Sequence, residues 1–224
     1  MDYKFSTSLM CMDFSKLKYE IEVLNECSDF MHIDIMDGHY VNNFALSPVF
    51  MEKVKGLVKI PMDAHLMIEE PSIFLEDLAK AGASFISPHA ETINKNAFRT
   101  IYRIKELGCR VGVVLNPATS LEDIKYYAHL LDKITIMTVD AGFAAQRFVP
   151  EVLEKIAKAK KWKEEYGYNY LIEVDGSCNE STYKVLTKAG AEVFVVGSTG
   201  LFGLDTDIKI AWNKMMLNFN REVK

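Results

Sequence analysis

The sequence predicts a closed (β/α)8 barrel, a TIM barrel of the α/β class whose sheet has eight parallel strands. Short β-rich runs alternate with segments of helical period along the 224 residues, as expected for successive βαβ units. Eight such runs are present, and no linker, low-complexity tract or composition shift separates them. Because 49% of the residues are hydrophobic, the chain can bury one sizeable core, and we expect residues 1–224 to form a single barrel domain.

The expected strands are spaced so that a helix can lie between each pair. They cover residues 4–9, 30–35, 62–67, 84–88, 110–115, 133–137, 170–175 and 192–196. Two of the segments between them show an apolar stripe at helical spacing, one at Phe14, Leu17, Ile21 and Leu24 and the other at Ile93, Ala97, Ile101 and Ile104. Such stripes predict helices that cover a parallel sheet.

Glycines mark the ends of several expected helices. Gly82, Gly108 and Gly190 each precede a strand, where glycine can adopt the left-handed conformation that ends a helix. The alternative architecture, an open doubly wound sheet, more usually has a GxGxxG turn after its first strand. This chain has Ser8-Leu9-Met10-Cys11-Met12 there, so the closed barrel is favoured.

Composition restricts the partners and the compartment. The net charge of −5 comes from 31 acidic and 26 basic residues scattered along the chain, which does not predict a nucleic-acid partner. The four cysteines form no CxxC pair, as is typical of reduced thiols in a cytosolic protein. We find no signal peptide and no apolar run of membrane-spanning length, so a cytoplasmic protein with no membrane partner is expected.

Polar residues recur on the inward face of three expected strands. Alternate side chains of a strand face opposite ways, so His32 and Asp34 share one face of the second strand, opposite to its apolar face. The same parity aligns Asp63 with His65, and Glu173 with Asp175. The carboxyl ends of barrel strands form the mouth where active sites gather.

Two imidazoles and two carboxylates at one mouth suit a divalent metal such as zinc, iron or manganese. The candidate ligands are His32, Asp34, His65 and Asp175. Taken singly, each histidine could be a hydrogen-bonded core residue and each aspartate a helix cap, but their shared position favours one site. His89 and Glu91 follow the fourth strand and either orient a ligand histidine or are ordinary loop residues.

Three loops rich in small residues predict a phosphate site. Residues 140–146 follow the sixth strand, Gly176-Ser177 the seventh, and residues 196–200 the eighth. Barrels often bind phosphate at this part of the mouth, where backbone amides can approach an anion. Ordinary βα turns also use glycine and serine, which is the alternative interpretation.

The motifs HIDIMDG, HLM, LNP, MTVDAGF, EVDGS and VGST occur in the order and spacing of the ribulose-phosphate 3-epimerase family, which the chain resembles over nearly its whole length. The resemblance implies a single ribulose-phosphate-binding type TIM barrel and a cytoplasmic isomerase. It also implies one divalent metal ion (zinc, iron, manganese or cobalt) and a homo-oligomer, either a dimer or a hexamer.

The resemblance also implies a role for each matching residue. The metal ligands would be His32, Asp34, His65 and Asp175, and Asp34 and Asp175 would also be the catalytic acid and base. The positions around the substrate would be Ser8, Met36, Met67 and Met137, although the methionines could equally be core filler. The phosphate-binding positions would be Gly142, Phe143, Ala144, Gly176, Gly197 and Ser198.

The motifs SLMCMD, ETIN and EVDGSCN most resemble members of the family that interconvert D-allulose 6-phosphate and D-fructose 6-phosphate. The alternative substrates are D-ribulose 5-phosphate and D-xylulose 5-phosphate, whose epimerases more typically have glycine where Ser177 stands. Alanine also replaces the family's usual proline at Ala141 and glycine at Ala145, and Ala145 would be strained if its φ were positive.

The implied reaction explains the need for two carboxylates. Inversion at carbon 3 requires a proton removed from one face and another delivered to the opposite face, through an enediolate whose charge must be stabilised. A barrel lyase or decarboxylase would more usually place a lysine at a strand end, and none is predicted there. The intact pair of Asp34 and Asp175 argues against a non-catalytic sugar-phosphate-binding barrel.

Overall fold

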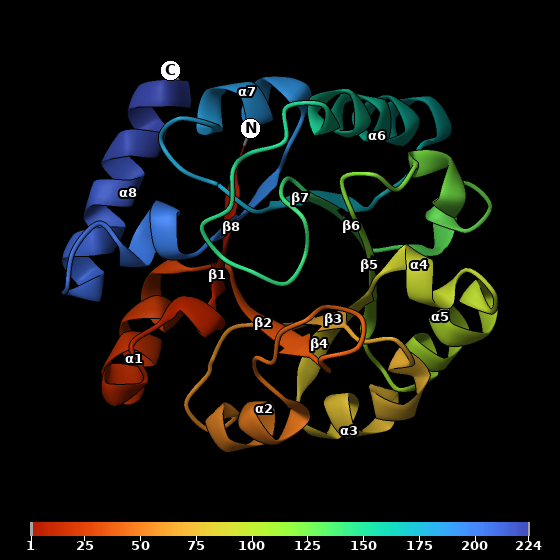
Figure 1. Ribbon diagram of the computed structural model, residues 1–224, viewed down its shortest axis with the longest axis horizontal. Helices are drawn as coiled ribbons and strands as arrows, with labels where there is room; N and C mark the ends of the chain where they lie inside the picture. Colours follow the sequence, from red (N-terminus) through yellow and green to blue (C-terminus); the bar gives the residue numbers. More distant parts are fainter. Residues whose placement is uncertain (1, 224) are drawn as a thin grey trace.

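The computed structural model describes residues 2–223, which form a closed barrel of eight parallel strands (Figure 1). Each strand pairs with the next in the sequence, and the first pairs with the last. The strands are β1 (Lys4–Ser8), β2 (Phe30–Met36), β3 (Met62–Met67), β4 (Ala83–Pro88), β5 (Arg110–Leu115), β6 (Lys133–Met137), β7 (Leu171–Asp175) and β8 (Val193–Val196). The predicted TIM barrel is confirmed.

Helices surround the barrel on its outside (Figure 1). They are α1 (Leu17–Cys27), α2 (Pro48–Val54), α3 (Leu75–Lys80), α4 (Ala90–Ile93), α5 (Ala97–Glu106), α6 (Val152–Tyr166), α7 (Tyr183–Ala189) and α8 (Ile208–Val223). Between β5 and β6 the chain forms two short 3-10 turns, Leu121–Ile124 and Ala128–Leu130, in place of an α-helix. These turns still bury Leu121, Ile124 and Ala128 against the sheet, so the strands remain covered.

The predicted strands agree with the observed ones to within one residue at each end. The apolar stripes are less regular than expected. Phe14 lies before α1 in a 3-10 turn and is 53% exposed, and a break after Ile93 separates α4 from α5. Gly82, Gly108 and Gly190 have positive φ, as predicted for glycines that end helices.

The side chains inside the barrel form layers, because residues paired in register on neighbouring strands lie at the same height. At the amino-terminal end, Phe30, Phe85 and Val193 form an apolar layer. Above it lie His32 of β2 and Asp63 of β3, which are paired in register, and the next inward pair toward the mouth is Asp34 and His65. Polar side chains therefore begin halfway up the barrel and continue to its carboxyl end.

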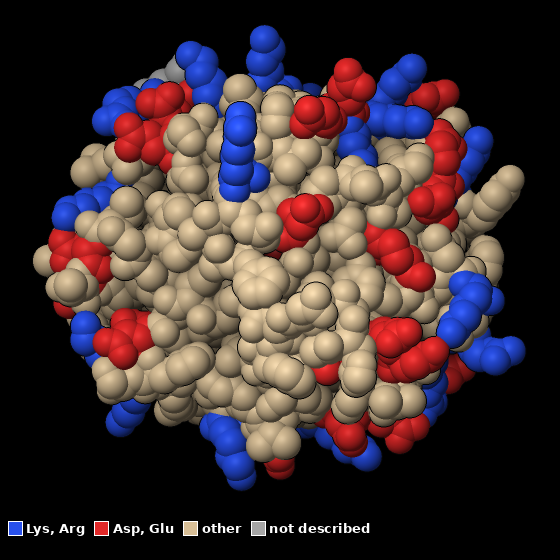
Figure 2. All heavy atoms as spheres, viewed as in Figure 1, with Lys and Arg blue, Asp and Glu red and all other residues tan. Residues whose placement is uncertain are grey.

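The face with the barrel mouth is covered in part by loops. The loops after β2 and β6 cross the middle of the view in Figure 1. Figure 2 shows the same face, with basic and acidic side chains interspersed around the rim and a mostly uncharged centre. Within residues 2–223, none of the helices combines the length and the apolar character needed to cross a membrane.

Candidate active site

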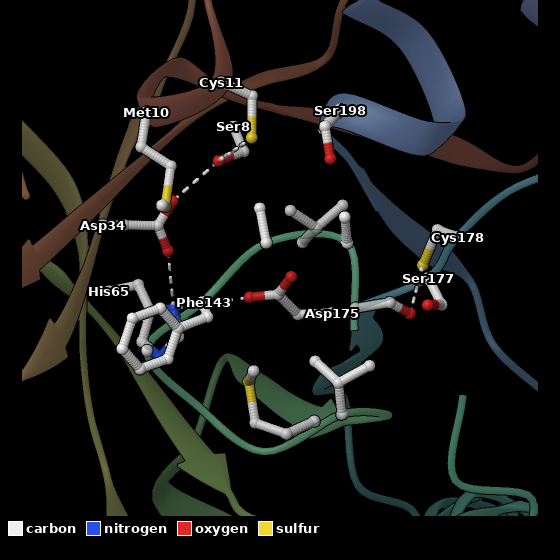
Figure 3. Close-up of a pocket in the computed structure, with 18 of the residues that line it drawn as sticks. Ser8, Met10, Cys11, Asp34, His65, Phe143, Asp175, Ser177, Cys178 and Ser198 are labelled. Carbon is white, nitrogen blue, oxygen red and sulfur yellow. Dashed lines mark hydrogen bonds and ion pairs between the residues drawn. The ribbon is translucent and has the colours of Figure 1, made fainter. Parts of the chain in front are cut away.

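Two histidines and two aspartates meet at the carboxyl end of the barrel. His32 and Asp34 lie on β2, His65 lies on β3, and Asp175 is the last residue of β7. Each offers one ligand atom, and these four atoms all lie within 4.8 Å of one another. In Figure 3, Asp34, His65 and Asp175 point toward one another across the pocket.

The separations of these atoms suit a bound cation. Nε2 of His32 lies 3.1 Å from Nδ1 of His65, 3.3 Å from Oδ1 of Asp34 and 3.4 Å from Oδ2 of Asp175. Nδ1 of His65 lies 3.2 Å and 3.4 Å from the same two carboxylate oxygens. Ligands at about 2.0–2.1 Å from a tetrahedral zinc are roughly 3.3 Å apart. Five of the six separations therefore match those around such an ion.

The electrostatics of the four groups are coupled. Burial acts to raise the pKa of both aspartates, but His32 and His65 outweigh it and hold the pKa of Asp34 and of Asp175 below the ordinary value. Burial acts to lower the pKa of the histidines, and the two carboxylates instead raise the pKa of each. The two histidines thus favour the anionic form of each aspartate, which is the form that binds a cation.

Hydrogen-bonding neighbours orient the side chains of Asp34 and His65. The Ser8 hydroxyl donates to Oδ2 of Asp34 at 2.7 Å (Figure 3). Nε2 of His65 lies 2.9 Å from Nε2 of His89, and Nδ1 of His89 lies 3.4 Å from a Glu91 carboxylate oxygen. Burial lowers the pKa of His89 to about 4, so its ring is neutral near pH 7 and can accept a hydrogen bond from His65. These contacts favour the interpretation that His89 and Glu91 orient His65 over the interpretation that they are ordinary loop residues.

One pocket brings together almost all of the predicted site residues. Its lining includes the predicted positions Ser8, Asp34, Met36, His65, Met67, Met137, Gly142, Phe143, Ala144, Asp175, Gly176, Gly197 and Ser198. His32 lies behind this surface, fully buried, and reaches the site through Nε2. The pocket is also lined by residues to which the sequence motifs assigned no role, namely Met10, Cys11, Val139, Cys178, Val195 and Thr199.

The loop region of this pocket contains unusual backbone conformations. Ala145 and Ser177 have φ of 59° and 49°, and they are the non-glycine residues with positive φ within residues 2–223. The expected strain at Ala145 is therefore present. The Ser177 hydroxyl donates to the Gln146 carbonyl at 2.5 Å and so ties the loop after β7 to the loop after β6. Such strain is commonly found at ligand-binding sites.

A buried lysine below the site was not predicted. Lys133, the first residue of β6, is 2% exposed and donates to Asp63 and Glu173 inside the barrel. Burial acts to lower its pKa, but these two carboxylates raise the pKa of Lys133 above the ordinary value. Its inward position could have been predicted from strand alternation, because Lys133 shares the inward face of β6 with Thr135 and Met137.

The chain was compared with known proteins at the level of sequence. The model of the Ribulose-phosphate 3 epimerase family matches residues 4–202. The chain belongs to this family. Ribulose-phosphate 3-epimerase of Bacillus subtilis (strain 168) is 43% identical over 197 residues, which cover 87% of this chain and 90% of the relative. The enzyme of the same name from Methanocaldococcus jannaschii is 39% identical over 209 residues, covering 93% and 87%.

Solved structures share the fold of this epimerase. KGPDC from Streptococcus mutans superposes with a TM-score of 0.76 at 12% identity and covers the whole of both chains. 3-Hexulose-6-phosphate synthase from Salmonella typhimurium gives a TM-score of 0.73 at 16% identity, covering 98% of this chain and 99% of that one. At such low identity these likenesses establish the barrel fold alone.

Membership of the family makes the chain an isomerase, an epimerase that acts on sugar phosphates. The residues that line the pocket suit a sugar-phosphate substrate. Asp34, His65 and Asp175 face three loops of small residues across one cavity, so a reacting carbon and an anionic group can be held at the same time.

Proposed function

We propose that this epimerase inverts carbon 3 of a phosphorylated ketose with the help of a divalent metal, and that D-ribulose 5-phosphate and D-xylulose 5-phosphate are its first candidate substrates. The observation that carries the proposal is the meeting of Asp34 and Asp175 around one histidine pair in a pocket that also contains the small-residue loops. The names of the relatives support the pentulose phosphates as first candidates.

The two aspartates are proposed as the acid and the base. They lie on β2 and β7, which are separated around the barrel, so their carboxylates can approach a substrate carbon from different sides. One carboxylate takes the proton of carbon 3, and the other, protonated, delivers a proton to the opposite face of the enediolate. The direction of the reaction decides which aspartate starts with the proton.

The proposed metal ligands are His32, His65, Asp34 and Asp175. Two nitrogens and two carboxylate oxygens suit zinc, iron, manganese or cobalt, and their spacing fits one ion. When bound, the cation polarises the ketone and neutralises charge that develops on the enediolate oxygens. Ser8 keeps the Asp34 carboxylate oriented through its second oxygen, which leaves the first free to face the site.

The phosphate is proposed to bind at the loops after β6, β7 and β8. Among the described residues, no lysine or arginine lines this pocket, so backbone amides and hydroxyl groups must supply the contacts. Gly142, Gly176 and Gly197 keep the backbone open to a ligand, and Ser198 contributes a hydroxyl (Figure 3). Phe143 and Ala144 complete the loop after β6.

The three methionines are proposed as walls beside the reacting carbons. Met36, Met67 and Met137 end β2, β3 and β6, and all three are buried pocket-lining residues. Thioethers are polarizable and uncharged, so they exclude water from the enediolate without competing for its protons.

Ser177 favours a second candidate pair, D-allulose 6-phosphate and D-fructose 6-phosphate. It stands where the pentulose enzymes more typically have glycine, and its hydroxyl ties the two loops beside the phosphate site. A fixed gap between these loops and the aspartates would set the length of the sugar that fits.

The reaction is tested in D2O with metal-loaded protein. The epimerase proposal requires deuterium at carbon 3 of recovered substrate and product, and protonated carbon 3 after many turnovers would contradict it. Comparison of kcat/KM for ribulose 5-phosphate and allulose 6-phosphate on the same sample decides between the substrates. A higher value for the hexulose would replace the first candidate with the second.

We further propose that residues 1–224 form one ribulose-phosphate-binding type domain, because β1 pairs with β8 and closes the sheet. A cytoplasmic homo-oligomer, dimer or hexamer, remains our expectation from the family resemblance. Sedimentation equilibrium of the purified chain would distinguish these states from a monomer.

A further inference from the structure

A second acidic cluster lies in the barrel directly below the proposed metal site. Asp63 and Glu173 are both buried, and the ammonium group of Lys133 lies between them, 2.6 Å from Oε1 of Glu173 and in contact with Oδ2 of Asp63. Asp63 and Glu173, together with His32, form a second group whose ligand atoms lie within 4.8 Å of one another. Lys133 therefore supplies the positive charge that this second cluster would otherwise draw from a metal ion.

His32 belongs to both clusters through opposite ring nitrogens. Its Nδ1 lies 3.1 Å from Oδ2 of Asp63, while its Nε2 lies 3.3 Å from Asp34 and 3.4 Å from Asp175. A carboxylate only accepts hydrogen bonds, so Nδ1 must carry the proton that it shares with Asp63. A ring that binds a cation through Nε2, on the side of Asp34 and Asp175, is neutral and keeps its proton on Nδ1.

The Asp63 carboxylate is itself held from two sides. The Ser87 hydroxyl donates to Oδ1 at 2.7 Å, and Lys133 donates to Oδ2. With three donors around it and almost no exposure, Asp63 has one orientation available inside the barrel. His32 is thus positioned by a carboxylate whose own position is fixed by β4 and β6.

We propose that Asp63, held by Lys133 and Ser87, is a positioning residue that fixes the tautomer and orientation of His32, so that Nε2 is presented to the metal. This inference rests on the proposed function, because it assumes that His32 binds the ion. In this arrangement Lys133 is the cation that neutralises the Asp63 carboxylate. Asp63 touches neither the substrate pocket nor the two proton-transfer groups.

The first test is the zinc affinity of metal-free protein, measured by competition with a chelator. Truncation in Asp63→Ala removes the acceptor for Nδ1, and the zinc Kd should rise by roughly 10–100-fold. Asp63→Asn keeps a carbonyl oxygen for Nδ1 and for Lys133, and its Kd should stay within about threefold of the wild type. If Asp63→Asn keeps the zinc affinity that Asp63→Ala loses, the effect of Asp63 comes from its hydrogen bond and not from its charge.

The matched control is Glu173→Ala, which truncates the other carboxylate of Lys133. Glu173 contacts Lys133 and Thr135, and no hydrogen bond joins it to His32 in the described part of the chain. The zinc Kd of this control should remain within about threefold of the wild type even if its melting temperature falls. Equal loss of affinity in Glu173→Ala and Asp63→Ala would reduce Asp63 to a general structural role and overturn the inference.

The second test is read on the wild-type protein, and a variant serves only to assign its signals. In zinc-loaded protein labelled with 15N-histidine, long-range 1H–15N correlation spectra report which ring nitrogen carries hydrogen, and His32→Gln identifies the signals of His32. We expect a protonated Nδ1 and a metal-bound Nε2, and a proton on Nε2 would overturn the inference. Wild-type protein that binds no zinc would instead contradict the metal part of the proposed function.

Discussion

Asp34 and Asp175 face the same two histidines but differ in how firmly they are held. Asp34 receives the Ser8 hydroxyl on one oxygen and faces both histidines with the other. Asp175 ends β7 and is more exposed, with 15% of its side chain accessible against 6% for Asp34. Asp34 is therefore held at more points than Asp175, whose side chain is the more accessible of the two.

Replacement of either aspartate should almost abolish turnover. Asp34→Asn and Asp175→Asn each remove an acid–base group and a carboxylate ligand, and a loss in kcat of at least roughly 10²–10⁴-fold is expected for the proton transfer alone. Asp77→Asn, on the exposed surface of α3, is the matched control and should keep wild-type kcat. Ordinary activity in one aspartate variant would remove that residue from the mechanism.

Removal of the backbone strain at Ala145 should stabilise the protein. Glycine adopts φ near 59° without the Cβ clash, so Ala145→Gly should raise the free energy of unfolding by up to about 1 kcal/mol. Ala144→Gly is the neighbouring control, and it should lower stability because Ala144 is not among the positive-φ residues. Urea midpoints of both variants check the pair, and stabilisation by Ala144→Gly would contradict the argument.

At the scale of elements, β5 makes room for the buried cluster by lacking a side chain. A Cβ added at Gly112 would lie 2.0 Å from Oγ of Ser87, 2.8 Å from its Cβ and 3.3 Å from Cε of Lys133. The glycine therefore allows Ser87 and Lys133 to lie inside the barrel on either side of β5, where both reach Asp63. The close approach of the Ser87 side chain to β5 therefore requires glycine at this position.

Gly112→Ala should accordingly destabilise the barrel. Insertion of a methyl group at a site this tightly packed should lower the free energy of unfolding by about 1–3 kcal/mol. Gly56→Ala is the control, because a Cβ at Gly56 meets nothing within 4 Å and its φ is not positive. Denaturant unfolding measures both, and equal midpoints for the two variants would show that β5 can move away from Ser87.

At the scale of the whole molecule, closure of the sheet links the two ends of the chain. Strand β1 pairs with β8 over four residues and with β2 on its other side. No strand of the barrel can therefore unfold without exposing its neighbours. We expect one cooperative unfolding transition with coincident circular dichroism and fluorescence midpoints, whereas two separated transitions would contradict the single-domain proposal.

Metal removal should lower the stability of the whole barrel, because the proposed ligands connect β2, β3 and β7. A free metal concentration of 100 times Kd stabilises the folded state by about 2.7 kcal/mol. For a chain of this size, that corresponds to a melting temperature higher by roughly 5–10 °C than in excess chelator. The variant Asp34→Asn should show a much smaller shift, and an unchanged melting temperature in the wild type would argue against metal binding.

Local patterns in the sequence determined the strands, the barrel and the candidate site. Alternation of apolar and polar residues within β2, β3 and β7 depends only on neighbouring residues, so it identified His32, Asp34, His65 and Asp175 correctly as inward-facing. Family motifs added the loops that line the pocket. These features are local or recurrent, and each could be recognised without the coordinates.

Only the tertiary structure decided the contacts inside the barrel below the candidate site. The contact of Lys133 with Asp63 depends on register and on the absence of a side chain at Gly112, between residues 70 positions apart in the sequence. His32 likewise turns Nδ1 toward Asp63 and Nε2 toward Asp34, and these contacts depend on the register of β2 and β3. The alternation along a strand predicts which face a side chain lies on. The height of that side chain in the barrel and its hydrogen-bond partners depend on how all eight strands pack.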